Sequence, residues 1–304
     1  MNYLLLTPVR NEEKTLPKVI ESVLSQELLP KLWLIINDGS TDQTQEIINK
    51  LIAQEKWVCS LELPIDPGGY GLHYATVVRK GFELLQDKAN KRKIQYELIG
   101  KVDSDIILEN DCFRKLVKEF ELDEKMGIAS PRLYFVDDNY ETNKNQASVK
   151  RDVALSDHPT DGIRLYRRDC FKEIGGMLIV RATETVAEVK ANLNGWKVTR
   201  IGHIHGYHLR KSHGSTPIWD KWKLVGSDQH YLGYHPLLVI CSCLFDLIYK
   251  RPIYLSLAHF WGYMKALMLN DSQIPDLEVR EYFGKKRLKE IIPQIPDLIK
   301  KMYS

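Results

Sequence analysis

The chain of 304 residues is long enough for one large α/β domain, or for one domain with a helical appendage. Hydrophobic residues make up 44% and charged residues 27%, so a packed core is expected and wholesale disorder is excluded. The 43 Lys and Arg against 40 Asp and Glu leave a formal charge of +3, which is too balanced for a protein built mainly to coat nucleic acid. Five Cys without a C-x-x-C pair favour a reducing, cytoplasmic compartment over a disulfide framework.

Short apolar runs alternate with helix-like segments through the first hundred residues. The apolar runs predict strands at 3–9, 31–36, 58–63 and 96–102. Apolar residues at helical spacing predict helices between them, over 16–24, around 47–52 and over about 74–87. Ser40 followed by Gln43 fits a capping box at the start of the second helix. Strands joined through helices imply right-handed crossovers, and therefore an α/β fold with a mainly parallel sheet.

The rest of the chain predicts another helix and two more strands, followed by a change in residue composition. Asn110 or Asp111 would cap a helix over about 112–120, and strands follow at 127–136 and 162–167. Residues 137–160 are polar with little periodicity, as in loops that cover an active site. After residue 225 the sequence turns to aromatic and apolar helices. We therefore expect a first domain over 1–225 and a helical extension over 226–304.

Two acidic clusters fall where predicted strands end. They are the run at 37–42, which contains Asp38, and the triplet of Asp103, Ser104 and Asp105. Ligands of a parallel sheet gather beyond the carboxyl ends of its strands, and residues i and i+2 of an extended segment point the same way. Asp103 and Asp105 can therefore converge on one cation, and oxygen ligands suit Mg²⁺ or Mn²⁺. Taken alone, either cluster is better explained by turn capping or a solvated loop.

Several motifs in a fixed order together resemble glycosyltransferase family 2. They are Thr7-Pro8-Val9-Arg10-Asn11-Glu12-Glu13, Ser22-Val23-Leu24-Ser25-Gln26, Asn37-Asp38-Gly39-Ser40-Thr41-Asp42, Asp103-Ser104-Asp105, the segment 162–176 and the segment 184–196. The resemblance covers about residues 1–215, and several ordered motifs are far more specific than any one of them. It implies a GT-A fold, in which a Rossmann-like nucleotide-binding half is joined to an acceptor half.

The resemblance also implies a donor site. Residues that would border the nucleotide are Thr7, Pro8, Arg10, Glu12 and Arg79, with Asp38 hydrogen-bonded to the base. Asp103, beside Ser104, would contact the ribose or the metal, and Asp105 would ligate the metal. The donor implied is a UDP-sugar, with a GDP-sugar as the alternative, and the metal is Mn²⁺ or Mg²⁺.

A catalytic base is expected near residue 184. In the family the essential Asp lies eleven residues before the Gly of a Gly-Trp pair, and this spacing from Gly195 leads to Glu184. Glu in place of Asp carries the carboxylate further out, and catalytic geometry is sensitive on that scale. Glu188, one helical turn later, is the second candidate. Without the surrounding motifs both would be explained by a solvated helix face.

Four of the nine His fall between residues 203 and 213. A zinc site would need Cys or further ligands nearby, whereas the Asp103-Ser104-Asp105 metal needs only one more. The resemblance assigns that role to His208, within His208-Leu209-Arg210. Arg210 and Lys211 suit a diphosphate or the phosphate of an acceptor lipid, with solvated charges as the alternative.

The apolar segments 231–245 and 253–269 allow two interpretations. They can pack on the catalytic domain or form a dimer interface, or they can rest on an anionic membrane near a lipid-linked acceptor. From residue 226 onward ten Lys and Arg stand against eight Asp and Glu, so the charge surplus is small. This balance favours packing over membrane contact.

The function expected is an inverting, metal-dependent transfer of a sugar from a nucleotide-diphosphate donor to an acceptor hydroxyl. The acceptor would be a glycan, a lipid-linked molecule or a small molecule, and nucleic acid is not expected as a partner. A sugar nucleotidylyltransferase is rejected, because 7–13 contains none of the Gly that its N-terminal loop needs. The alternative from another class is a non-catalytic sugar-nucleotide sensor, which Glu184 in place of Asp would favour.

Overall fold

The chain forms two compact units, Met1–Lys211 and Ser212–Ser304. The computed structural model describes residues 1–65, 72–136, 151–152, 159, 162–209, 217–249 and 253–291. The division falls between Lys211 and Ser212, earlier than the expected change at residue 225. The reason is that α7 (Ile218–Tyr231) packs along α9 (Tyr254–Met268) and so belongs to the second unit.

The first unit is built on one mixed sheet with the strand order β3-β2-β1-β4-β8-β6-β9-β5, and β7 pairs with β6. β1 (Tyr3–Val9), β2 (Leu32–Asp38), β3 (Val58–Leu63) and β4 (Leu98–Val102) run parallel to one another, as the sequence predicts. Because β2, β1 and β4 are neighbours, their carboxyl ends bring Asp38, Arg10 and Asp103 to one edge of the sheet.

The other half of the sheet mixes directions. β8 (Ile163–Arg167) is antiparallel to both β4 and β6 (Met126–Phe135), and β6 is parallel to β9 (Lys197–His208). β5 (Ile106–Leu108) is antiparallel to β9, and β7 (Arg151–Asp152) is antiparallel to β6. Most of the polar segment 137–160 lies outside the described residues.

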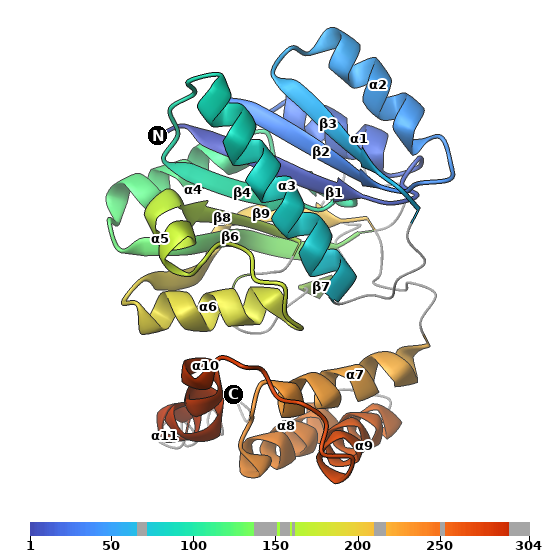
Figure 1. Ribbon diagram of the computed structural model, residues 1–304, viewed down its shortest axis with the longest axis vertical. Helices are drawn as coiled ribbons and strands as arrows, with labels where there is room; N and C mark the ends of the chain where they lie inside the picture. Colours follow the sequence, from blue (N-terminus) through green and yellow to red (C-terminus); the bar gives the residue numbers. More distant parts are fainter. Residues whose placement is uncertain are drawn as a thin grey trace. The chain divides into compact units, whose positions relative to one another are not determined.

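Helices cover both faces of this sheet, which makes three layers (Figure 1). α1 (Leu16–Leu24), α2 (Thr44–Gln54) and α4 (Cys112–Leu122) pack on one face, and α3 (Leu72–Lys91), α5 (Arg168–Glu173) and α6 (Thr183–Leu193) pack on the other. Alternate strand residues serve the two faces, since Tyr3 and Leu5 point into one core and Leu4 and Leu6 into the other. This double burial explains why the central strands β1 and β2 are largely apolar along their length.

The expected capping box at Ser40 is wrong. α2 begins at Thr44, whose N–H donates to Oδ1 of Asp42 at 3.0 Å. Ser40 lies too far upstream, and its hydroxyl instead donates to Oδ1 of Asn37 at 2.6 Å. At α4 the helix begins directly after Asp111, but the Phe113 N–H donates to Oε1 of Gln26 at 3.1 Å rather than to the Asp111 side chain.

The second unit contains α7, α8 (Pro236–Tyr249), α9, α10 (Leu277–Glu281), the π-helix η2 (Tyr282–Lys286) and α11 (Arg287–Ile291). α7 and α9 approach so closely that a Cβ on Gly262 would lie 2.0 Å from the Lys223 carbonyl oxygen. None of the helices within the described ranges combines the length and apolar character needed to cross a bilayer.

Candidate active site

Asp38 ends β2 between two cationic or polar partners. The guanidinium of Arg10 lies 3.4 Å from Oδ2 of Asp38, and Nε2 of His73 on α3 lies 2.8 Å from the same oxygen. Asp38 is largely buried, so these contacts fix the direction of its carboxylate. Sequence reasoning identified Asp38 and Arg10 but missed His73, which no motif marked.

The segment after β1 is held in place by its own backbone contacts. The Glu12 N–H donates to Oγ1 of Thr44 at 2.8 Å, and the Glu12 carboxylate accepts a hydrogen bond from the Thr15 hydroxyl. Thr7 is fully buried, and its hydroxyl accepts a hydrogen bond of 2.9 Å from Nε1 of Trp33. Thr7 therefore supports the site from the core, while Glu12 faces the hollow described next.

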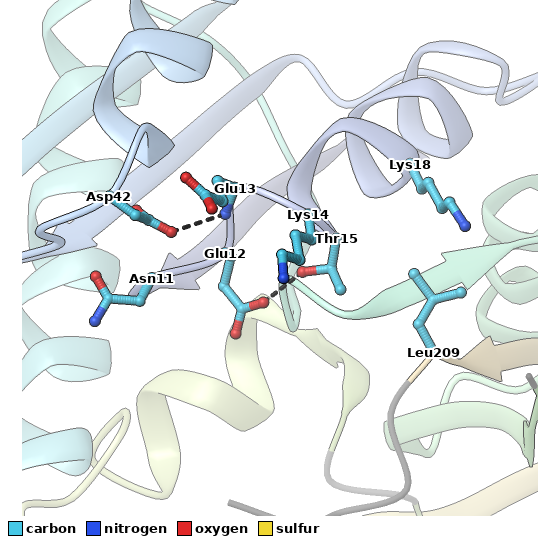
Figure 2. A pocket seen from close by; sticks show the side chains of 8 residues that line it. All are labelled: Asn11, Glu12, Glu13, Lys14, Thr15, Lys18, Asp42 and Leu209. Carbon is cyan, nitrogen blue, oxygen red and sulfur yellow. Dashed lines mark hydrogen bonds between the residues drawn. The ribbon is translucent and has the colours of Figure 1, made fainter. Parts of the chain in front are cut away.

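A hollow of about 570 Å³ lies beside Glu12 at the start of α1 (Figure 2). Its lining is mixed in charge: Asn11, Glu12, Glu13, Lys14, Thr15, Lys18, Asp42 and Leu209. Oδ2 of Asp42 accepts a hydrogen bond of 3.1 Å from the Glu13 N–H, which ties the start of α1 to the loop before α2. The charged lining and the size suit a hydrophilic ligand.

Lys101 connects the Asp103-Ser104-Asp105 segment to the expected base. Its side chain is fully buried in β4, where Nζ lies 3.0 Å from Oδ1 of Asp103 and 3.2 Å from Oε1 of Glu184. Nζ also contacts the Tyr74 hydroxyl. The structure thus brings together Asp103 and Glu184, which are 81 positions apart in the sequence. Ser104, between the two Asp, is buried.

The pKa values of these two carboxyl groups are shifted in opposite directions. Partial burial raises the pKa of Asp103 to about 7, and Lys101 offsets this only in part. Burial also acts to raise the pKa of Glu184, but the charges of Lys101 and Arg164 outweigh it and leave that pKa lowered. Glu184 is therefore ionised at neutral pH, as a proton acceptor must be.

The local backbone at the start of α6 directs Glu184 into the site. Ala182 precedes the helix with a left-handed φ of 51°, an unusual conformation for a non-glycine residue. The Thr183 hydroxyl donates to the carbonyl oxygen of Leu178 at 2.7 Å, and NH1 of Arg164 donates to the Glu184 carbonyl oxygen at 3.3 Å. The first turn of α6 is thus held from both sides.

Glu188 has a different environment from Glu184. Its Oε1 lies 2.7 Å from NH2 of Arg164, and both side chains are buried. Arg164 on β8 lies directly opposite Lys101 on β4. These two neighbouring cations contact two carboxylates one helical turn apart on α6: Lys101 contacts Glu184, and Arg164 contacts Glu188. The ion pair of Glu188 with Arg164 ties α6 to β8.

Asp105 and His208 face each other across β5 and β9. Nε2 of His208 lies 3.9 Å from Oδ2 of Asp105, and the strand register pairs Ile106 with His208. A carboxylate and an imidazole so placed fit one divalent cation, because Mg²⁺ and Mn²⁺ take their remaining ligands from water and phosphate oxygens. Within the described part of the chain no group of three or more His, Cys, Asp or Glu is arranged to hold a metal.

Three candidate residues from the sequence are not part of this arrangement. Nε of Arg79 donates to Oε1 of Glu83 at 2.8 Å, one turn along α3, beside a hollow of about 240 Å³ that Phe82 and Phe171 also line. Arg210 and Lys211 lie outside the described residues. Sequence reasoning also missed Lys101 and Arg164, although a charged residue inside a strand that is otherwise apolar was a usable signal.

The fold resembles those of solved sugar-nucleotide enzymes. A mannosyltransferase from Pyrobaculum calidifontis in complex with GDP-Man and Mn²⁺ superposes with a TM-score of 0.53 at 13% identity, over 90% of this chain and 76% of that one. S. aureus TarS 1–349 in complex with UDP-GlcNAc gives a TM-score of 0.50 at 16% identity, over 90% and 74%. At these identities the likeness establishes the GT-A fold.

Sequence comparison establishes the family. A poly-β-1,6-N-acetyl-D-glucosamine synthase of Staphylococcus aureus (strain COL) is 22% identical over 226 residues, which are 71% of this chain and 48% of that protein. Across the curated relatives that it matches, the chain spans between 12% and 48% of their length. The family profile described as Glycosyl transferase family 2 matches residues 5–181. The chain therefore belongs to glycosyl transferase family 2.

Proposed function

We propose that this chain is a metal-assisted glycosyltransferase that moves a sugar from a nucleotide-diphosphate donor to an acceptor hydroxyl. The observation that carries the proposal is the meeting of an ionised Glu184 with Asp103 through Lys101, at the edge where β1, β2 and β4 end. Solved structures with this fold contain UDP-GlcNAc, or GDP-Man with Mn²⁺, which supports a nucleotide-sugar donor and a divalent cation.

The donor would lie along this edge of the sheet. Asp38, oriented by Arg10 and His73, would accept hydrogen bonds from the base, and Asp103 would contact the ribose. Asp105 and His208 would hold Mn²⁺ or Mg²⁺, which when bound neutralises the diphosphate as a Lewis acid. A UDP-sugar is the default donor, and a GDP-sugar is the alternative that binding measurements distinguish.

The chemical step would be one displacement at the anomeric carbon. The acceptor oxygen forms a bond to that carbon while the bond to the diphosphate oxygen breaks, and the nucleoside diphosphate leaves with the electron pair. Glu184 accepts the proton that the acceptor hydroxyl loses. Attack opposite the leaving group inverts the anomeric configuration.

Calorimetry of UDP and GDP, each with and without Mn²⁺, tests the donor site. Wild-type protein should bind one nucleotide in a metal-dependent manner, and Asp105→Ala should abolish that dependence. Glu83→Ala serves as the control: Glu83 pairs with Arg79 on α3, and this variant should bind the nucleotide as the wild type does. Absence of nucleotide binding in the wild type would contradict the donor assignment. Nucleotide binding without turnover of any donor would favour the sensor.

We also propose that the second unit makes peripheral contact with a lipid surface, at the cytoplasmic side of a membrane. The outward residues of α8 and α9 are apolar or aromatic, whereas the polar Asp246 and His259 are buried and joined by a contact of 3.1 Å. Leu257 and Trp261 are 60% and 51% exposed, and Lys265 is the one Lys, Arg, Asp or Glu of α9. Small or polar residues inside and apolar residues outside are typical of helices in contact with lipid.

Sedimentation with phosphatidylcholine vesicles tests this contact in the full chain. The wild type should bind, Leu257→Glu/Trp261→Glu should not, and Leu122→Glu, at a residue that is 72% exposed on α4, should bind as the wild type does. Because the face carries so little charge, added salt should change binding little. If the wild type does not bind vesicles but forms a dimer, and the double variant is a monomer, the apolar face is instead an interface with a second copy of the chain.

A further inference from the structure

A fully buried lysine in a central strand needs an explanation. Lys101 interrupts the apolar run of β4, and no part of its side chain reaches solvent beyond 1%. Burying an ammonium group is strongly unfavourable unless its charge and its three donors are matched. The aliphatic part of a lysine side chain packs no better than a leucine would. The unfavourable burial of the ammonium group therefore indicates that its charge has a functional role.

The contacts of Lys101 go beyond charge neutralisation. One ammonium faces two carboxylates, Asp103 at 3.0 Å and Glu184 at 3.2 Å, with the Tyr74 hydroxyl as the third partner. Glu188, one helical turn further along α6, lies 2.7 Å from the neighbouring cation, Arg164. Lys101 is therefore assigned to the two residues that the proposed reaction uses, one on the donor side and one on the acceptor side.

We propose that Lys101 is a positioning residue that fixes the carboxylate of Glu184 for proton transfer. This inference rests on the proposed function. Lys101 engages Oε1 of Glu184, which leaves Oε2 to meet the acceptor hydroxyl. A glutamate has one more rotatable bond than an aspartate, and anchoring one oxygen removes that freedom. The Glu184–Lys101 pair thereby gives a long side chain the fixed reach that proton transfer requires.

The shared ammonium also links the two halves of the site. Asp103 and Glu184 contact the same Nζ, so the position of the donor-side carboxylate bears directly on the position of the base. Without Lys101 the two carboxylates would repel each other in a poorly solvated site. Glu184 would then turn away from Asp103, and the oxygen that faces the acceptor would be displaced.

A double-mutant cycle on the full chain tests this role. Lys101→Met should lower kcat about a hundredfold, because a displacement of the base by about 1 Å costs that much, with a smaller change in the acceptor KM. In a Glu184→Gln background the same substitution should cost little, since the group that it positions is already gone. Arg167→Met removes another cation of the same sheet, whose partners are backbone carbonyl oxygens, and should leave kcat unchanged.

The outcomes separate this inference from the proposed function. If Lys101→Met lowers kcat equally in the wild-type and Glu184→Gln backgrounds, or leaves kcat unchanged while Glu184→Gln abolishes turnover, the positioning role is overturned and the transferase stands. If the wild type binds nucleotide without turning over any donor, both fall. Should Lys101→Met lose its circular-dichroism signal, Lys101→Gln, which keeps a donor for each carboxylate, replaces it in the same cycle.

Discussion

The buried pair of Arg164 and Glu188 gives the sharpest test of stability and of the choice of base. Both groups are buried and lie 2.7 Å apart in the sheet–α6 interface, so Arg164→Met removes this guanidinium from beside the buried Glu188 carboxylate. Removing one partner of such a pair costs about 3–5 kcal/mol, which lowers the melting temperature of a domain of this size by roughly 6–20 °C. Arg164→Met/Glu188→Leu should recover much of that loss, because both members of the pair are then replaced by apolar groups.

Urea unfolding at neutral pH measures this effect. Arg114→Met, which breaks an exposed pair with Glu27, is the control and should cost less than about 1 kcal/mol. A loss below about 1 kcal/mol in Arg164→Met would refute the reasoning.

Three further outcomes are expected. Glu184→Gln should lower kcat by about 10²–10⁴-fold. Because the pKa of Glu184 is lowered, the acid limb of the wild-type pH–rate profile that Glu184→Gln removes should lie below the ordinary range of a glutamate, and it is distinct from the titration of Asp103, whose pKa is raised to about 7; a limb near pH 6 that disappears with Glu184 would contradict this. His73→Ala should weaken nucleotide binding, measured by calorimetry, because Asp38 loses a partner at 2.8 Å; unchanged affinity would remove His73 from the site. Gly262→Ala should destabilise the second unit, since its Cβ would meet the Lys223 carbonyl oxygen at 2.0 Å, while nucleotide binding persists; a wild-type melting profile would show that the helices separate at little cost.

Much of the fold could be predicted because the sheet is buried on both faces. Double burial makes β1 a nearly continuous apolar run, and its predicted limits, 3–9, match the structure. The predicted limits of β3, 58–63, match as well, although this edge strand is only partly buried and contains Ser60 and Glu62. β5 and β9 were missed because β5 has three residues, and because polar and glycine residues break the pattern of β9. Strand direction beyond β4 could not be predicted either, since an antiparallel β8 depends on long-range pairing.

The candidate site was predictable where chemistry follows a motif and unpredictable where it depends on tertiary contact. The resemblance of His208-Leu209-Arg210 to a family segment pointed to His208 as a partner of Asp105, and the structure places Nε2 of His208 3.9 Å from Oδ2 of Asp105. His73 and Lys101 carry no motif. Their roles arise from α3 crossing β2 and from α6 packing beside β4, which no local pattern encodes.

The reversed direction of β8 has a consequence for how this protein could diversify. Because β8 runs against β4, it begins beside Asp103, whose N–H donates to the Gly162 carbonyl oxygen at 2.8 Å. Any peptide spliced in ahead of Gly162 therefore emerges at the catalytic edge and leaves the strand order unchanged. A Cβ on Gly162 would lie 2.9 Å from Cδ1 of Ile106, so a larger residue there would require the Ile106 side chain to shift. A change in the segment that precedes Gly162 would therefore act at this edge of the sheet without altering the strand order.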